Sequence, residues 1–415
     1  MKTLFNIIVL LVITSVSIYS SDQPHPRAAG VPADLLNKVR TTPEEGLKAL
    51  VEYLTKGITE EYEKIRILHD WVAINTVYDT ESYFSGSDSY YDPYEVAIHG
   101  KSVCEGYVNL LQELSDLAGL KSEKIGGYAR GYGYSASGKE TINDNHAWNI
   151  FEVNGRKMIT DVTWGSGYLM GKQFRVAYSL DYFDIRPEDF IYSHFPSESK
   201  WQLLSRPLNE DEFLALPNLG GKYFAFGLSA PTKLTENPDN KGVWSFSVNV
   251  PEDVQISTAL FYKNKEVPDA TLPMIYDGKC TVNIKFGESG DHTLLLYAKN
   301  TGEEQYISVA TLRVSGDKAE TPGFPMAYAP FFENPIELLS PLVNPVTTGA
   351  EVLFRVRAKV FQGLTVINNG KFFEMQKEPG DIWSVKAVIT AGEIFLGWKS
   401  GSNTYEYLCK WQAGN

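Results

Sequence analysis

The chain has 415 residues, of which 43% are hydrophobic and 21% are charged, a globular composition that excludes disordered and fibrous classes. At about 150 residues per domain, this length predicts two or three domains. Asp and Glu number 51 against 38 Lys and Arg, giving a formal net charge of -13, so nucleic acid is not expected as a partner because its phosphates would be repelled.

The first 20 residues have the pattern of a secretory signal peptide. Lys2 precedes an apolar run from Leu4 to Ile18, and small residues follow up to Ser21. The run is shorter than the about 20 residues that a bilayer-spanning helix needs, although an uncleaved membrane anchor is the alternative. We therefore expect residues 1–20 to be a signal peptide and the protein to be secreted, either extracellular or periplasmic.

The next segment predicts a linker, two helices and a loop. Residues 21–40 are polar and rich in Pro and Ala, as in a linker. Helical spacing of apolar residues predicts helices over Glu45 to Lys56 and Glu60 to Val77. From Asp79 to His99 the sequence reads as a long loop. We expect its part from Tyr83 to Tyr94 to border a functional cleft, and the alternative is a loop that only packs its own rings.

A helix is predicted to begin close to Cys104. Apolar residues recur at spacings of three and four from Val103 to Ala118, and Gly119 supplies a C-terminal stop. Ser102 with Glu105 three residues later has the capping-box pattern, which makes Ser102 the predicted N-cap and Cys104 the second helical residue. That position favours a thiolate, as a nucleophile requires. A cysteine buried as an apolar residue is the alternative.

A β-hairpin follows, and its register brings a histidine close to a carboxylate. Asn145 to Val153 alternates as a strand, Asn154-Gly155 is a two-residue turn signal, and Arg156 to Trp164 predicts the second strand. This register puts His146 and Asp161 on one face as diagonal neighbours, about 7 to 8 Å apart at the backbone.

Cys104, His146 and Asp161 together predict a catalytic triad, which we call the candidate triad. Cys104 would attack a carbonyl carbon, His146 would take the thiol proton and later protonate the leaving amine, and Asp161 would hold the imidazole tautomer. The backbone N–H of Cys104 is a candidate oxyanion donor. A core histidine with a satisfied carboxylate is the alternative for the pair. A zinc site is a third reading, but a fourth ligand is missing, so no metal is expected.

The other histidines and cysteines have weaker patterns. His99 is close to Cys104 in sequence and is the rival general base. His69 lies in a predicted helix, and we expect it to be structural. Cys280 and Cys409 are too few for a disulfide framework, so buried single thiols are expected.

Beyond residue 205 the sequence alternates in short strands separated by turns. Residues 243–248 resemble residues 351–356, which lie 108 positions later, and two further pairs of segments follow in the same order. Each copy is near 100 residues long, which predicts two β-sandwich modules in tandem. The Pro-rich stretch 322–345 is expected to contain their boundary.

The chain resembles the transglutaminase-like superfamily at three motifs, which are Gly100-Lys101-Ser102-Val103-Cys104-Glu105-Gly106-Tyr107, Asn145-His146-Ala147-Trp148-Asn149 and Asp161-Val162-Thr163-Trp164. It resembles the kyphoscoliosis-peptidase branch at Asp181-Tyr182-Phe183-Asp184, Pro187-Glu188-Asp189-Phe190, His194-Phe195-Pro196 and Trp201-Gln202-Leu203-Leu204. The resemblance covers about residues 40–205. His194 matches a branch motif, and we expect it to be structural.

The resemblance implies an α+β fold with a papain-like transglutaminase core. We expect this catalytic domain at residues 41–205, followed by two all-β Ig-like sandwich modules at residues 206–318 and 319–415, since the branch carries such modules. It implies a cysteine peptidase or protein-glutamine acyltransferase that acts on peptide or glutamine carboxamide bonds through a thioester, with no cofactor. The signal peptide is a departure, because the animal members act inside cells, so their partners are not carried over.

The expected partners are protein or peptide substrates. The β modules predict association with a cell surface or with extracellular matrix. The alternative function is that of a non-catalytic surface adhesion or scaffold protein, which would use the transglutaminase-like core as a binding module.

Overall fold

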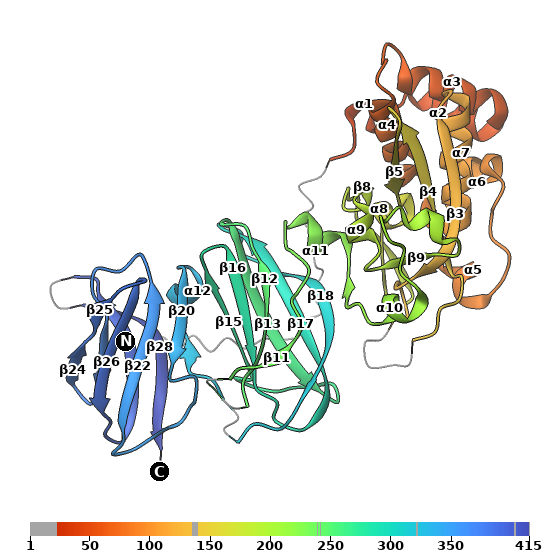
Figure 1. Ribbon diagram of the computed structural model, residues 1–415. Coiled ribbons are helices and arrows are strands. Elements are labelled where there is room, and N and C mark those ends of the chain that lie inside the picture. Colours follow the sequence, from red (N-terminus) through yellow and green to blue (C-terminus); the bar gives the residue numbers. More distant parts are fainter. Residues whose placement is uncertain are drawn as a thin grey trace. The chain divides into compact units, whose positions relative to one another are not determined.

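A computed structural model describes residues 23–134, 140–238, 240, 242–320, 323–401 and 404–414 (Figure 1). The predicted signal peptide at residues 1–20 lies outside these residues. Among the helices that are described, none is both long enough and apolar enough to cross a membrane. The chain divides into two compact units, one that extends to residue 125 and includes 147–184, and one that comprises 126–146 and everything from 185 onward.

The first unit is mainly helical. Its helices are α1 (Pro26–Ala29), α2 (Ala33–Thr41), α3 (Pro43–Thr55), α4 (Glu61–Asn75), α5 (Thr80–Ser85), α6 (Pro93–His99), α7 (Cys104–Leu117) and α8 (Val162–Ser166). The two helices predicted before residue 78 correspond to α3 and α4, whose ends lie within two residues of the predicted ones. The apolar faces of α3, α4 and α7 bury one core, which includes Leu50, Leu68 and Leu111.

Two predictions for the N-terminal half are wrong. Residues 21–40, expected to be a linker, contain α1 and most of α2 in their described part. Ala28 and Val39 are buried in the helical core, so this segment belongs to that core. The prolines that suggested a linker instead begin helices, as Pro26 does in α1, because the first helical position needs no N–H. The predicted loop from Asp79 to His99 contains α5 and α6.

A five-stranded sheet carries His146 and His194, and Asp161 follows one of its strands. The strand order is β8-β5-β4-β3-β9. The bounds are β3 (Lys121–Ala129), β4 (His146–Val153), β5 (Arg156–Thr160), β8 (Phe183–Ile185) and β9 (His194–Pro196). Two short pairs lie outside this sheet, β1 (Val77–Tyr78) with β2 (Lys101–Ser102) and β6 (Gly167–Met170) with β7 (Gln173–Val176).

The predicted hairpin forms in the predicted register. Val153 lies opposite Arg156 in the β4–β5 pair. Asn154 and Gly155 both have positive φ, 50° and 78°, as a type I′ turn requires. The second strand is shorter than predicted, because β5 ends at Thr160 and the chain then enters α8. The prediction that this strand continues to Trp164 is therefore wrong.

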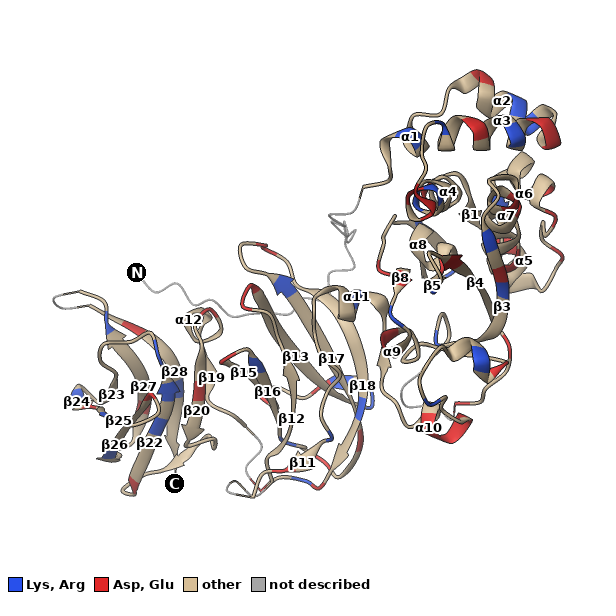
Figure 2. Cartoon of the chain, turned by 45° about the horizontal axis from the view of Figure 1, so that its top comes forward, with Lys and Arg blue, Asp and Glu red and all other residues tan. Residues whose placement is uncertain are grey.

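Short helices lie between β8 and β9 and after β9. They are α9 (Pro187–Phe190), the 3-10 helix η1 (Ser199–Gln202), α10 (Glu210–Leu214) and α11 (Gly221–Ala225). Figure 2 shows acidic residues gathered on α10, whose first turn consists of Glu210, Asp211 and Glu212. Asn209 caps this helix in a capping box. Negative charge in the first turn stabilises a helix through its dipole.

One buried arginine connects the segment after β3 to residues far along the sequence. The Arg130 side chain is fully buried and forms an ion pair with Glu140 (2.8 Å). Its guanidinium also donates to the carbonyl oxygens of Tyr192, Phe213 and Leu216, at 3.0 to 3.1 Å. The planar fork of an arginine can serve several acceptors at once, so this side chain holds together α10 and the segments that contain Glu140, Tyr192 and Leu216.

The rest of the second unit is β structure. One pair of sheets has the orders β10-β18-β17-β13-β14 and β11-β12-β16-β15. These strands are β10 (Asn218–Leu219), β11 (Thr235–Glu236), β12 (Trp244–Asn249), β13 (Val254–Tyr262), β14 (Lys265–Glu266), β15 (Thr271–Tyr276), β16 (Lys279–Ile284), β17 (Gly290–Asn300) and β18 (Ile307–Gly316). Buried residues from both sheets, such as Val282 and Leu294, share one core, so this is a β-sandwich.

A second β-sandwich has the sheet orders β19-β28-β27-β23-β24, with β21 also on β28, and β20-β22-β26-β25. Its elements are β19 (Met326–Ala327), α12 (Ala329–Phe332), β20 (Ile336–Ser340), β21 (Val346–Thr347), β22 (Glu351–Ala358), β23 (Thr365–Asn368), β24 (Lys371–Glu374), β25 (Gln376–Glu378), β26 (Ile382–Val388), β27 (Gly392–Lys399) and β28 (Tyr405–Gly414). Phe354 and Trp411 meet in its core, with ring centroids 5.3 Å apart.

The repeat read from the sequence corresponds to equivalent strands. The first matched segments fall on β12 and β22, which are inner strands of their sheets. The later ones fall on the long antiparallel pairs β17–β18 and β27–β28, and each pair contains one register shift. The predicted α+β class with a β-rich C-terminal region is therefore confirmed.

Candidate active site

Cys104 is the first residue of α7, one position earlier than predicted. Val103 is the N-cap and no side chain caps the helix, so the capping box expected from Ser102 and Glu105 is wrong. Tertiary contacts use both residues elsewhere. Ser102 belongs to β2 and its hydroxyl donates to the carbonyl oxygen of Tyr90, and Glu105 pairs with Lys124. The thiol still lies at the positive end of the helix dipole.

Cys104 differs from the other two cysteines in its exposure. All three are free thiols, but Cys104 is partly exposed whereas Cys280 and Cys409 are buried. Burial raises the pKa of Cys280 to about 12 and raises the pKa of Cys409 well above its ordinary value. The thiolate is the nucleophilic form of cysteine, so the two buried thiols are chemically silent at neutral pH. The expectation of buried single thiols at these two positions is confirmed.

The segment from Tyr83 to Tyr94, which we call the aromatic segment, lies against the start of α7. Besides the bond from Ser102 to Tyr90, the side chain of Asn109 donates to the carbonyl oxygen of Tyr91 (2.8 Å). A Cβ atom at Gly106 would lie 2.5 Å from the carbonyl oxygen of Tyr90, so only glycine fits there. The segment predicted to border a cleft therefore packs on the turn that carries Cys104.

His99, the rival base, is occupied by other contacts. Its ring stacks on Tyr90, with centroids 4.0 Å apart and an interplanar angle of 9°. Its Nε2 lies 3.4 Å from a carboxylate oxygen of Glu95 on the same helix. These contacts give His99 a role in holding the aromatic segment in place.

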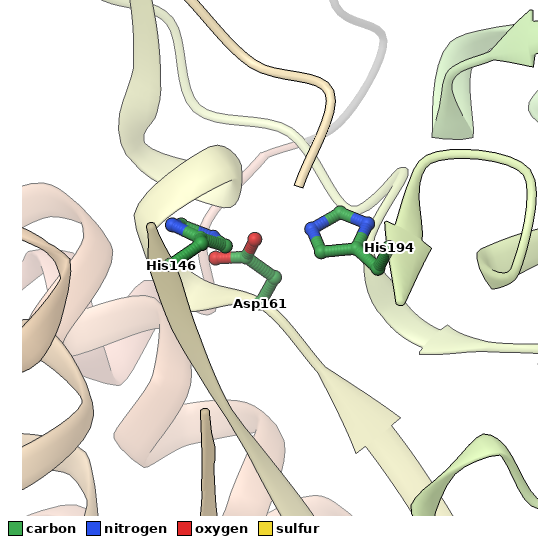
Figure 3. A group of neighbouring side chains, drawn as sticks. All are labelled: His146, Asp161 and His194. Atoms are coloured by element: carbon green, nitrogen blue, oxygen red, sulfur yellow. The ribbon is translucent and has the colours of Figure 1, made fainter. Parts of the chain in front are cut away.

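His146 and Asp161 lie at the ends of neighbouring strands. His146 begins β4 and is half-buried. Asp161 follows β5 and is buried, and one of its carboxylate oxygens accepts a hydrogen bond from the backbone N–H of Trp164 (3.0 Å), which caps α8. Figure 3 shows the Asp161 carboxylate between the imidazoles of His146 and His194, and one ligand atom from each residue lies within 4.8 Å of the others.

His194 was expected to be structural, and no catalytic role was predicted for it. Its ring is buried and stacks on Phe190, with centroids 3.9 Å apart, and its Nδ1 lies 2.8 Å from the hydroxyl oxygen of Ser193. His194 begins β9, which pairs with the end of β3 opposite Ala129. The sequence signal was its place in a motif of the branch that the chain resembles, and no local pattern predicts this pairing.

This group of side chains also bears on metal binding. Two imidazoles and one carboxylate form a donor set suited to a divalent transition metal, and in the described part of the chain His146, Asp161 and His194 form such a group. Cys104, the third residue of the candidate triad, is not a member of it. A metal held here would occupy the imidazole that a cysteine mechanism needs as a base.

The pKa of Tyr78 is raised, and both Cys104 and Asp161 contribute to the increase. Burial raises the pKa of Tyr78 far above its ordinary value, and electrostatic interactions with Cys104, with Tyr83 and Tyr107 and with Asp161 add to the increase. Tyr78 pairs with Ser102 in the short β1–β2 ladder, two residues before the cysteine. Its phenol therefore stays protonated at neutral pH.

His69 belongs to a buried polar cluster rather than to the candidate triad. Its Nδ1 lies 3.1 Å from Asp70, whose carboxylate also accepts hydrogen bonds from Arg66 (2.9 Å), Tyr178 (2.6 Å) and the backbone N–H of His25 (2.7 Å). Burial alone would raise the pKa of Asp70, but the hydrogen bonds and the charge of His69 lower it below its ordinary value. The cluster holds the α1 segment on α4, a structural role.

Comparison with known proteins matches residues 48–164 to the family model of the transglutaminase-like superfamily. Kyphoscoliosis peptidase of Mus musculus is 30% identical over 176 residues, which are 42% of this chain and 27% of the mouse protein. Hillarin of Drosophila melanogaster is 28% identical over 246 residues, which are 55% of this chain and 30% of the fly protein.

The chain thus spans less than a third of the length of these curated relatives. Among solved structures, a crystal structure of a TGase is 19% identical and covers 36% of each chain, with a TM-score of 0.24.

Proposed function

Because residues 48–164 form a transglutaminase-like core, we propose that this chain is an exported cysteine enzyme acting on peptide or glutamine carboxamide bonds of proteins. Cys104 is the nucleophile, His146 the general base and acid, and Asp161 the group that orients the imidazole. The product of the first half-reaction is a thioester on Cys104. Water or an amine then resolves it, which makes the enzyme a peptidase or a protein crosslinking enzyme.

The first half-reaction breaks one C–N bond and forms one C–S bond. His146 takes the proton from the thiol of Cys104 as the sulfur attacks the carbonyl carbon, and the oxyanion collapses when His146 returns that proton to the leaving amine. The backbone N–H of Cys104, at the unpaired start of α7, is one oxyanion donor.

One observation carries the proposal. The segment that matches the family model contains Cys104, His146 and Asp161 together, and within it the cysteine is a partly exposed helix-start thiol. The location of Asp161 beside His146 supports the roles given to that pair (Figure 3). A binding module has no need for an accessible thiol at this position.

The rate at which iodoacetamide alkylates Cys104 in the folded protein tests the proposal. We expect Cys104 to react at least tenfold faster than glutathione at pH 7, since an adjacent general base activates a thiol nucleophile. His146→Ala should slow the reaction, and Cys104→Ala should abolish it. Equal rates in the native protein and in His146→Ala would favour the non-catalytic adhesion or scaffold alternative.

Two assays separate the candidate second half-reactions. Incorporation of a labelled primary amine into a glutamine-bearing protein reports crosslinking, and release of new N-termini from the same protein reports hydrolysis. The relative from Mus musculus bears the name of a peptidase, which favours hydrolysis for this chain. Both products should disappear in Cys104→Ala.

Export and the domain division belong to the same proposal. Residues 1–20 direct secretion, and the catalytic domain comprises residues 41–205 together with the helices α1 and α2 that pack on its core. The modules at 206–318 and 319–415 position this domain on a cell surface or matrix. N-terminal sequencing of protein recovered outside the cytoplasm should begin close to residue 21. A mature protein that retains Met1 would contradict a cleaved signal.

A further inference from the structure

A pocket of about 720 Å³ opens at one end of the C-terminal β-sandwich. Its walls come from the ends of four strands and from the loop between β22 and β23. Thr365 begins β23, Glu374 ends β24, Lys399 ends β27 and Tyr405 begins β28. This volume is in the range of about 300 to 1,000 Å³ that small-molecule sites occupy.

Aromatic rings form most of the apolar lining. Phe361 and Trp383 are nearly buried, at 8% and 6% exposure, and Trp398 lies beside Phe361 with ring centroids 5.1 Å apart. Tyr405 continues this surface and contacts Phe372, whose ring centroid is 5.3 Å away. Phe372 is 54% exposed, so the aromatic surface extends past the pocket.

The rim of the pocket is polar, and its side chains are available to a ligand. Gln362, Glu374 and Lys399 are exposed, and within the described part of the chain none of their side chains forms a hydrogen bond or an ion pair. Together they offer an amide, a carboxylate and an ammonium group, which are both donors and acceptors. One negative and one positive charge balance each other, so the rim has no net preference for an ionic ligand.

From these features we propose that the C-terminal module binds a neutral polysaccharide strand in this pocket. The face of an aromatic ring carries negative charge density, which attracts the weakly positive C–H groups on the face of a pyranose ring. Hydroxyl groups around the same sugar need donors and acceptors, as the rim provides. The exposed ring of Phe372 offers a place for the next sugar of the strand.

The occupant follows from charge and shape. A chain of net charge -13 disfavours polyanions such as an acidic polysaccharide or a nucleic acid. An aliphatic ligand would leave the polar rim groups without partners after they lose water, at a cost in free energy. A neutral sugar satisfies both the rings and the rim.

Affinity electrophoresis of the full chain tests the proposal. Native gels would contain hydroxyethyl cellulose, galactomannan, xylan or dextran, with polygalacturonate as the acidic comparison. We expect at least one neutral polysaccharide to retard the protein and polygalacturonate to have no effect. Cys104→Ala should be retarded equally, because the pocket is independent of the candidate triad.

Variants connect the retardation to the pocket. Tyr405→Ala and Glu374→Gln should each weaken binding about tenfold. Tyr407→Ala, a matched loss of an exposed ring two residues along the same strand but outside the pocket lining, should bind like the native chain. Circular dichroism of each variant confirms folding.

Two results would overturn the proposal. One is the absence of retardation by all four neutral polysaccharides. The other is equal retardation of Tyr405→Ala, Glu374→Gln and the native protein, which would locate the sugar elsewhere.

Discussion

Asp161 accepts a hydrogen bond from the backbone N–H of Trp164 and, with the same carboxylate, lies beside His146. The side chain therefore has two tasks that substitution can separate. The first is to cap α8, which needs an oxygen acceptor. The second is to stabilise a protonated imidazole, which needs a negative charge.

Asp161→Asn should keep the cap and lose the charge. Asn and Asp are about equally good N-caps, so we expect the free energy of unfolding to change by about 0.5 kcal/mol or less. The alkylation rate of Cys104 should fall tenfold or more. Asp161→Ala should lose both, with about 1 kcal/mol of stability in addition. An unchanged alkylation rate in Asp161→Asn would remove this residue from the mechanism.

Thiol counting follows from the contrast between Cys104 and the two buried cysteines. At pH 7.5 in the native state, a maleimide probe should modify one thiol per chain, because burial keeps Cys280 and Cys409 protonated and covered. Mass spectrometry of the intact protein reads the number of adducts directly. Three adducts should appear in denaturant, and none in native Cys104→Ala. Rapid native modification of Cys409 would show that the C-terminal sandwich opens readily.

Gly106→Ala should disturb the turn that carries the cysteine. A methyl group there would meet the carbonyl oxygen of Tyr90 at 2.5 Å, and overpacking of this kind costs about 1–3 kcal/mol. We expect both the urea midpoint and the alkylation rate of Cys104 to fall. Gly126→Ala is the matched control, since nothing lies within 4 Å of the added atom and its φ is not positive. Equal effects of the two substitutions would contradict the close fit.

Acid stability should depend on Asp70. Its pKa is lowered in the folded state, so its contribution to stability is present above the unfolded value of about 3.9 and is lost as pH falls toward the folded value. Asp70→Asn should cost about 2–3 kcal/mol at pH 7, because hydrogen bonds to charged groups contribute about 1.5–3 kcal/mol. The difference between the native chain and Asp70→Asn in urea unfolding should shrink between pH 5 and pH 3. A constant difference would mean that the charge is not responsible.

Arg130→Met should be among the more damaging substitutions. It leaves the Glu140 carboxylate without its partner and several carbonyl groups without a donor. Removing one partner of a buried ion pair costs about 3–5 kcal/mol. Arg186→Met, which breaks an ion pair from an arginine with a 74% exposed side chain, should cost about 0–1 kcal/mol. Urea unfolding followed by tryptophan fluorescence compares the two.

Local sequence was sufficient where local chemistry decides the structure. The Asn154-Gly155 turn alone fixed the register of β4 and β5, and with it the closeness of His146 and Asp161. The end of α7 close to Gly119, which has a φ of 72°, could likewise be predicted from the sequence. In both places the signal and its consequence lie within a few residues.

Prediction failed where residues far apart in the sequence contact the same side chains. Ser102 had the local pattern of an N-cap, but the bond to Tyr90 and the ladder with Tyr78 use it instead. His194 came to the Asp161 carboxylate through the pairing of β9 with β3, which no local pattern encodes. The alternation that suggested a strand up to Trp164 continues past Thr160, where capping by Asp161 turned the chain into α8.

The bond from Ser102 to Tyr90 and the close fit of Tyr90 on Gly106 attach the aromatic segment to the residues on both sides of Cys104. A ligand that displaces Tyr90 must also displace the peptide groups on either side of the sulfur. In an enzyme of the proposed kind, the same contacts would then affect both which acyl donor is accepted and how fast Cys104 attacks it. A substitution in the aromatic segment that lets the site accept more kinds of acyl donor would therefore also change the turnover rate.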